Sequence, residues 1–224
     1  MQTRITDPAV TLTDYGLAIE CAVVVVLLLR RQVTDDTLRL WLVVFFAAAS
    51  AASLLGGTVH GFLRADSPRR AILWPATLIS ILVSGLAVSF VAARIQLGPE
   101  AQQVVRVLAI GLLAIMVLAV IFAKQSFAIA IAGYLPATLF LLYAFAATYE
   151  RTRAGMVWWG IAGVFLSIVG AAVQRLGVKI HRVYLDHNAL YHVLQGAGFW
   201  MIYKAVQFIS TTLPSIGRTN AIAS

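Results

Sequence analysis

Four histidines are the residues in this chain best suited to chemistry, and they lie at positions 60, 181, 187 and 192. Imidazole is a natural ligand of Zn²⁺, and a catalytic zinc site keeps three protein ligands and one water. The ion lowers the pKa of that water to about 7 and so supplies a hydroxide nucleophile. We therefore predict His60, His187 and His192 as metal ligands.

Three carboxylates accompany these histidines. Asp66 follows His60 by six positions, and Asp186 immediately precedes His187. Glu20 lies inside the first apolar run, where an ionisable group is costly and usually faces a partner within the protein. A carboxylate beside a metal-bound water can act as general base or acid. Glu20, Asp66 and Asp186 are therefore the candidates for catalytic proton transfer or for orienting a ligand.

The composition identifies the class of protein that must position these side chains. Of 224 residues, 61% are hydrophobic and only 12% are charged. A soluble domain carries about 25% charged residues. This excludes a soluble globular enzyme and a disordered chain. The single Cys21 excludes an internal disulfide framework. An integral membrane protein remains.

The net charge of +8 does not indicate nucleic-acid binding. Nucleic-acid recognition needs clustered basic residues. Here the Lys and Arg residues are spread between apolar runs, where they flank membrane spans and contact lipid headgroups. Membrane lipids are therefore the expected surroundings, and the sequence leaves the oligomeric state open.

Seven apolar runs are long enough to cross a bilayer, which takes about 20 residues of helix. Backbone groups in lipid must be paired internally, and no run alternates in polarity as a barrel strand would. We predict an all-α seven-helix bundle forming a single transmembrane domain over residues 1–224. The predicted spans are Val10–Leu29, Leu40–Leu63, Ala71–Ala93, Gln103–Ala123, Ser126–Thr148, Ala154–Gln174 and Ala189–Leu213.

With seven consecutive crossings, the end of the second span and the start of the seventh lie at the same side of the membrane. His60 and His192 are therefore expected at a common depth. The spacing of His187 and His192 points their side chains about 140° apart on an ideal helix. They can share an ion only if His187 precedes the helix or a π-bulge intervenes. Asn188, His192 and Gln195 share a helical face instead, which would give a hydrogen-bonded stripe without metal.

Small residues recur every fourth position before His60. Ala52, Gly56 and His60 form one row, and Gly57 and Gly61 lie in the row beside it. Small residues at this spacing let helix backbones approach closely in lipid. The pattern predicts a tight helix contact that leads up to His60.

Flanking charge gives an expected orientation. Arg30 and Arg31 follow the first span, whereas only Arg4 precedes it. Because positive residues favour the cytoplasmic side, the amino terminus is expected outside. The expected location is the bacterial inner membrane.

Two segments resemble a known group of proteins. They are Gly56-Gly57-Thr58-Val59-His60-Gly61 and Asp186-His187-Asn188-Ala189-Leu190-Tyr191-His192-Val193-Leu194. With the span count, they resemble the seven-transmembrane hydrolase superfamily of alkaline ceramidases, adiponectin-type receptors and haemolysin III-like proteins. In that superfamily the final histidines are spaced by four rather than five, and a Ser stands where this chain has Gly56. The resemblance implies a zinc-dependent hydrolase acting on a lipid amide, with a lipid-like substrate.

Two other function classes fit the same residues. Histidines from two helices at one depth could ligate haem iron axially, as in a haem-binding membrane subunit. Alternatively, Glu20, Asn188 and Gln195 could form the polar pathway of a transporter or signalling bundle that holds no metal.

Overall fold

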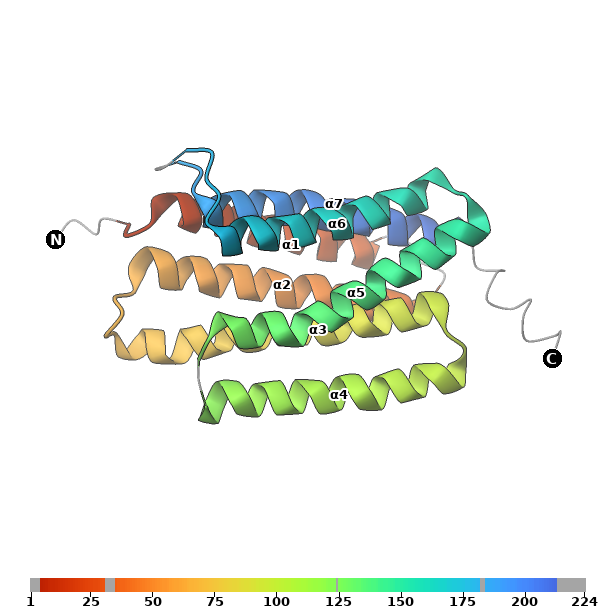
Figure 1. The fold of residues 1–224 in the computed structure, drawn as a ribbon, viewed down its shortest axis with the longest axis horizontal. Helices are drawn as coiled ribbons and strands as arrows, with labels where there is room; N and C mark the ends of the chain where they lie inside the picture. The colour runs from red at the N-terminus through yellow and green to blue at the C-terminus, as the bar shows by residue number, and fades with distance from the viewer. Residues whose placement is uncertain (1–4, 31–34, 124, 182–183, 213–224) are drawn as a thin grey trace.

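The described part of the chain consists of seven long α-helices and contains no strand. A computed structural model describes residues 5–30, 35–123, 125–181 and 184–212. The helices are α1 (Pro8–Arg30), α2 (Asp36–Phe62), α3 (Pro68–Gln96), α4 (Pro99–Phe122), α5 (Phe127–Thr152), α6 (Gly155–Leu176) and α7 (His187–Thr212) (Figure 1). The predicted all-α seven-helix bundle is confirmed.

Most helices extend beyond the predicted apolar runs because polar and proline residues shape their ends. Pro68 and Pro99 occupy the first positions of α3 and α4. A backbone N–H at this position has no partner within the helix, so proline costs no hydrogen bond there. Asp35 caps α2 by accepting a hydrogen bond from the backbone N–H of Leu38 at 2.9 Å. Arg4, Arg31 and Leu213, which entered the predicted orientation and the last span, lie outside the described residues.

The outer surface of the bundle is apolar, as an integral membrane protein requires. Within the described residues, six helices are long and apolar enough to cross a membrane. The exception is α7, which carries Asn188, His192 and Gln195 on a face turned into the protein. These polar residues lower its hydropathy, although its 26 residues match the length of its neighbours.

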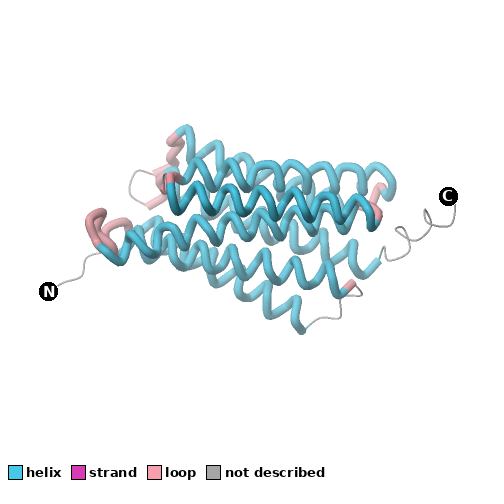
Figure 2. The backbone as a smooth tube through the Cα atoms, turned by 90° about the horizontal axis from the view of Figure 1, so that it is seen from below, coloured by secondary structure: helices cyan, strands magenta, loops and turns pink. Residues whose placement is uncertain are grey.

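Six helices form a closed ring in the order α1, α2, α3, α5, α6, α7, with α7 packed back against α1. The remaining helix, α4, lies outside this ring against α3 and more sparsely against α5 (Figure 1). Val120 is its one buried residue. The connecting loops gather at the two ends of the bundle (Figure 2).

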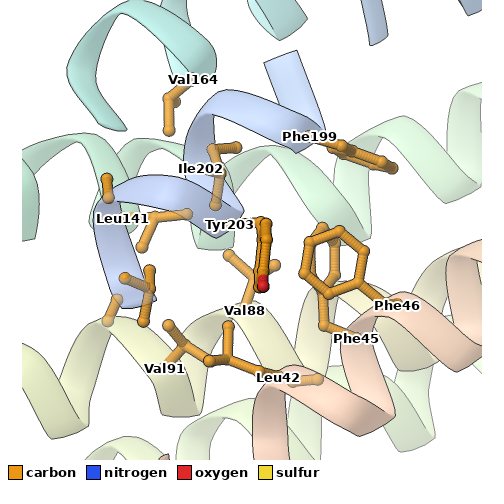
Figure 3. Packing of buried hydrophobic residues seen from close by; sticks show 14 of the residues in the cluster. Leu42, Phe45, Phe46, Val88, Val91, Leu141, Val164, Phe199, Ile202 and Tyr203 are labelled. Atoms are coloured by element: carbon orange, nitrogen blue, oxygen red, sulfur yellow. The ribbon is translucent and has the colours of Figure 1, made fainter. Parts of the chain in front are cut away.

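An aromatic cluster joins α2 to α7 across the middle of the ring. Phe45 and Phe199 have ring centroids 5.0 Å apart in an edge-to-face arrangement, and Phe46 and Tyr203 meet at 6.4 Å. Figure 3 shows these rings facing one another among aliphatic side chains of α3, α5 and α6. Edge-to-face pairs stabilise a core beyond simple burial. This cluster closes the bundle interior below the polar region described next.

Candidate functional site

A cavity of about 300 Å³ lies inside the ring, between the aromatic cluster and the end of the bundle where α1 begins. Ligand sites commonly lie between the helices of a bundle, and this volume is at the small end of their range. One group of lining residues is polar: Asp14, Ser53, His60, Thr77, Ser84, Gln174, Asn188, Tyr191, His192 and Gln195. The other is largely apolar or aromatic: Val10, Leu17, Ala49, Ala52, Gly56, Trp74, Ile81, Phe127, Tyr134 and Phe199.

A buried pair of side chains, Asp14 and His192, links α1 to α7 at the cavity wall. Asp14 Oδ1 lies 3.2 Å from His192 Nε2, and the two side chains are only 6% and 11% exposed. The Thr13 hydroxyl lies 3.2 Å from the other ring nitrogen, Nδ1. Both nitrogens of His192 are therefore directed at α1.

The hydrogen bonds around this pair indicate how many protons the two side chains carry. The Thr13 hydroxyl donates to the carbonyl oxygen of Ala9 at 2.9 Å, so its oxygen is left to accept Nδ1–H of His192. Nε2 and Asp14 Oδ1 then need one proton between them. With the Thr13 hydroxyl donating to Ala9, the pair is neutral overall, either as acid and imidazole or as carboxylate and imidazolium.

Small residues of α2 allow α1 to come close enough to form this pair. A Cβ atom at Gly57 would lie 2.9 Å from Asp14 Cβ, and one at Gly61 would lie 2.6 Å from Thr11 Oγ1. Gly56 faces the Asp14 carboxylate. The predicted close helix contact before His60 is therefore present, and its partner is α1.

His60 is the histidine whose ring faces the cavity without a hydrogen bond to any residue that the structure describes. It is half-buried, and its ring meets the edge of Trp74 at 6.1 Å between centroids. His192 and Asp186 both lie within electrostatic range of it. His60 and His192 both line this cavity, so the two helix segments that the predicted topology brings to one side of the membrane do meet. A bound molecule can approach the His60 ring nitrogens more directly than those of His192.

A polar stripe runs along α7, as the helical spacing predicts. Asn188, His192 and Gln195 all line the cavity. Gln174 Nε2 of α6 donates to Asn188 Oδ1 at 3.1 Å. Gln195 is 5% exposed, and nothing in the described chain hydrogen-bonds its carboxamide. This stripe supplies uncharged donors and acceptors to the cavity.

Asp186 and His187 take structural positions at the start of α7. The Asp186 carboxylate accepts hydrogen bonds from the backbone N–H groups of Asn188 and Ala189, at 3.0 and 2.8 Å. This caps the helix. His187 is the first helical residue rather than part of a preceding turn, and it does not line the cavity. Its Nδ1 atom is buried without a hydrogen-bond partner among the described residues.

The other two predicted carboxylates lie away from the cavity. Asp66 is 77% exposed in the turn between α2 and α3, where it pairs with Arg64 at 3.3 Å. Glu20 lies between α1 and α7, beside Gly196, where an added Cβ atom would be 2.5 Å from its Oε2 atom. Neither residue lines the cavity that His60 and His192 share.

The described donor set does not fit a three-ligand zinc centre. No group of three or more His, Cys, Asp or Glu side chains that could hold a metal ion occurs in the described chain. His192 points both ring nitrogens at α1, and His187 lies outside the cavity lining. The residue four positions before His192 is Asn188, an amide. Zinc ligation by His60, His187 and His192 therefore stays a prediction from the sequence.

Asp14 is the site residue that the sequence analysis did not identify. It follows Thr13 near the start of the first span, and its polarity suggests that it belongs to the polar segment that precedes the helix. A pattern does reveal it: Val10, Asp14, Leu17, Cys21, Val24 and Leu28 follow a three-and-four spacing, and all are buried. A carboxylate on the apolar stripe of a helix must face the protein interior.

Comparison with known proteins places the chain in a family without assigning its chemistry. No curated protein and no solved structure matches it. Nothing therefore tests the resemblance to the seven-transmembrane hydrolases, which remains a prediction. A family described as "Family of unknown function (DUF6962)" matches residues 9–211, nearly the whole chain, and the protein belongs to this family.

Proposed function

We propose that the protein binds a small amphiphilic molecule of the membrane in the cavity of its helical ring. The observation that carries this proposal is a lining that combines polar side chains with aromatic and apolar ones. Asp14, His60 and Gln195 are among the polar lining residues, and Trp74 and Phe127 are among the aromatic ones. A molecule with a polar head and an apolar body satisfies both at once.

Unpaired polar groups support the same proposal. Ser53 and Gln195 are more than nine-tenths buried, and nothing in the described chain hydrogen-bonds either side chain. His60 is unpaired as well. All three side chains line the cavity, so a bound molecule can form hydrogen bonds with them.

Filling the cavity is expected to remove the bound molecule. Ala52 lines the cavity on α2, and phenylalanine there would occupy the space of the apolar body. Native mass spectrometry of the wild-type protein should show a retained lipid-sized adduct, and the Ala52→Phe variant should lose it. Ala47 on the same helix is exposed, so Ala47→Phe is the matched control and should keep the adduct. Equal retention in both variants would contradict the proposal.

Hydrolysis of an amide in the bound molecule is a second proposal, favoured by the position of the His60 ring. His60 would take a proton from water as the water oxygen attacks the carbonyl carbon. It would return that proton to the amine as the C–N bond breaks. The carboxamide N–H groups of Asn188 and Gln195 would stabilise the developing oxyanion.

A fluorogenic fatty-acyl amide tests this second proposal. General acid–base catalysis contributes about 10²–10⁴-fold, so His60→Gln should reduce turnover by about that factor. His181 is exposed on the connector outside the cavity, and His181→Gln should leave turnover unchanged. Activity that a chelator removes and zinc restores would support the zinc-dependent reaction implied by the sequence resemblance. Equal turnover in the two variants would reject His60 as the base.

We further propose the bacterial inner membrane as the location, with the amino terminus outside. The support is Arg30 after the first span. In a Cys21→Ala background, a membrane-impermeant maleimide applied to whole cells should label Ser67→Cys, which lies at the cavity end of the bundle. Labelling only after the cells are opened would reverse the orientation.

A further inference from the structure

Building on the proposed binding function, we infer that the ligand is a neutral lipid with one acyl chain and a hydroxyl- or amide-bearing head, and that Gln195 and Ser53 hold this head. The inference starts from the position of these two side chains. Gln195 lies three residues beyond His192, and Ser53 lies seven residues before His60. At 1.5 Å per residue these offsets are about 4.5 Å and about 10 Å toward the bundle centre. Both side chains therefore lie deeper than the histidines.

The polar groups of Gln195 and Ser53 are uncharged. A carboxamide offers two N–H donors and a carbonyl acceptor, and a serine hydroxyl offers one donor and two lone pairs. Both side chains are nearly fully buried and line the cavity, and neither has a hydrogen-bond partner in the described chain. These two side chains differ in depth by about 6 Å. A head with more than one hydroxyl or amide group, as in glycerol or an ethanolamide, supplies donors and acceptors for both.

An anionic head finds no positively charged side chain in the lining of this cavity. No Lys or Arg is among the lining residues, and Arg70, whose guanidinium carbon is 6.0 Å from the centroid of the Trp74 ring, lies outside that lining. The carboxyl group of Asp14 is engaged by His192 at 3.2 Å and offers no positive charge. Burying a phosphate or carboxylate against uncharged groups is strongly unfavourable. A neutral head is therefore preferred to an anionic one.

The size and shape of the cavity select a single chain. Its volume of about 300 Å³ holds roughly ten water-sized groups, enough for a small head and the first methylenes. The first half of α5 packs on α3, where Tyr134 meets Gly85, and its second half packs on α6, where Phe145 meets Gly160. The lining includes Tyr134 of α5 and Gln174 of α6, two helices that diverge toward the end of the bundle where α1 begins (Figure 1). The remainder of the one acyl chain has to leave the cavity, because this volume does not hold it.

Thermal unfolding of the full chain in detergent tests the inference. The only cysteine, Cys21, is buried, so a thiol-reactive dye reports unfolding directly. Ligands that bind the folded state raise the unfolding midpoint. The probes are monooleoylglycerol and oleoylethanolamide, with oleic acid and oleoyl lysophosphatidic acid as anionic lipids of the same chain. The neutral probes should raise the midpoint by several degrees, and the anionic probes should not.

The variants separate this inference from the proposed function. Gln195→Met keeps the side-chain length but removes its hydrogen bonds, and it should abolish at least half of the shift, as should Ser53→Ala. Gln207 lies about three turns further along α7 and outside the cavity lining, so Gln207→Met should keep the full shift. A shift produced equally by the anionic probes, or retained in both cavity variants, overturns the inference while the binding function stands. No shift with any of the four lipids counts against both.

Discussion

Replacing Gly163 with alanine is expected to destabilise the bundle by about 1–3 kcal/mol or more, as overpacking of a tight contact does. A Cβ atom at this position would lie 2.6 Å from the carbonyl oxygen of Gly198 and 3.1 Å from the backbone nitrogen of Ile202. These neighbours are backbone atoms of α7, which cannot move aside as a flexible side chain can. The helices α6 and α7 would have to separate, and α7 carries four of the ten polar residues that line the cavity.

The same substitution at Gly111 is the matched control. Gly111 lies in α4, and a Cβ atom there would meet nothing within 4 Å. Alanine is favoured over glycine inside a helix by up to about 1 kcal/mol, so Gly111→Ala should be neutral or stabilising. Dye labelling of Cys21 during heating measures both variants. Midpoints that change equally at the two positions would contradict the account of α6–α7 packing.

Removing Asp14 is expected to cost about 3 kcal/mol, the lower end of the range for breaking one side of a buried pair. Asp14→Ala leaves His192 Nε2 without its partner at 3.2 Å, in a region where both side chains are nearly buried. The link between α1 and α7 would then rest on Thr13 and apolar packing. The midpoint of unfolding is the measurement, again through Cys21.

A double-mutant cycle shows whether that loss comes from the pair itself. In contact, Asp14 and His192 should couple by about 0.5–3 kcal/mol, so the Asp14→Ala/His192→Ala variant should be less destabilised than the two single variants together. Asp66→Ala is the surface control, because this residue is exposed, and it should change stability by no more than about 0.5 kcal/mol. Additive losses in the double variant would mean that the two side chains do not support each other.

The fold could be predicted from hydropathy because lipid imposes a simple requirement. Each span must satisfy its own backbone, so long apolar runs become helices and their number sets the topology. The helix ends were predicted less well, since proline and capping residues such as Pro68 and Asp35 extend a helix without adding hydropathy. The start of α7 illustrates the consequence. The apolar run begins at Ala189, but the helix begins at His187 because Asp186 caps it.

The candidate site was predicted in part, because topology fixes the depth of a side chain but not its direction around the helix axis. Depth alone brought His60 and His192 to one cavity. The directions of their side chains around the helix axis leave His187 and Glu20 outside the cavity lining. For the same reason, Asn188 and Gln195 are part of the lining. Asp14 could be recognised only from its place on the buried stripe of α1. Without that pattern, a polar residue near the start of an apolar run indicates only where the helix begins.

Photo-crosslinking tests the central claim, that a membrane amphiphile binds inside the ring, most directly. A monoacylglycerol with a diazirine near its head would be activated with the full-length protein in bilayer nanodiscs, and the adducts would be mapped by peptide mass spectrometry. The account predicts adducts on the cavity residues Trp74, Phe127 and Tyr134, removed by excess unlabelled monooleoylglycerol. Adducts confined to the outer surface of the bundle, such as Leu108 and Phe122 of α4, and unchanged by competitor, would contradict it.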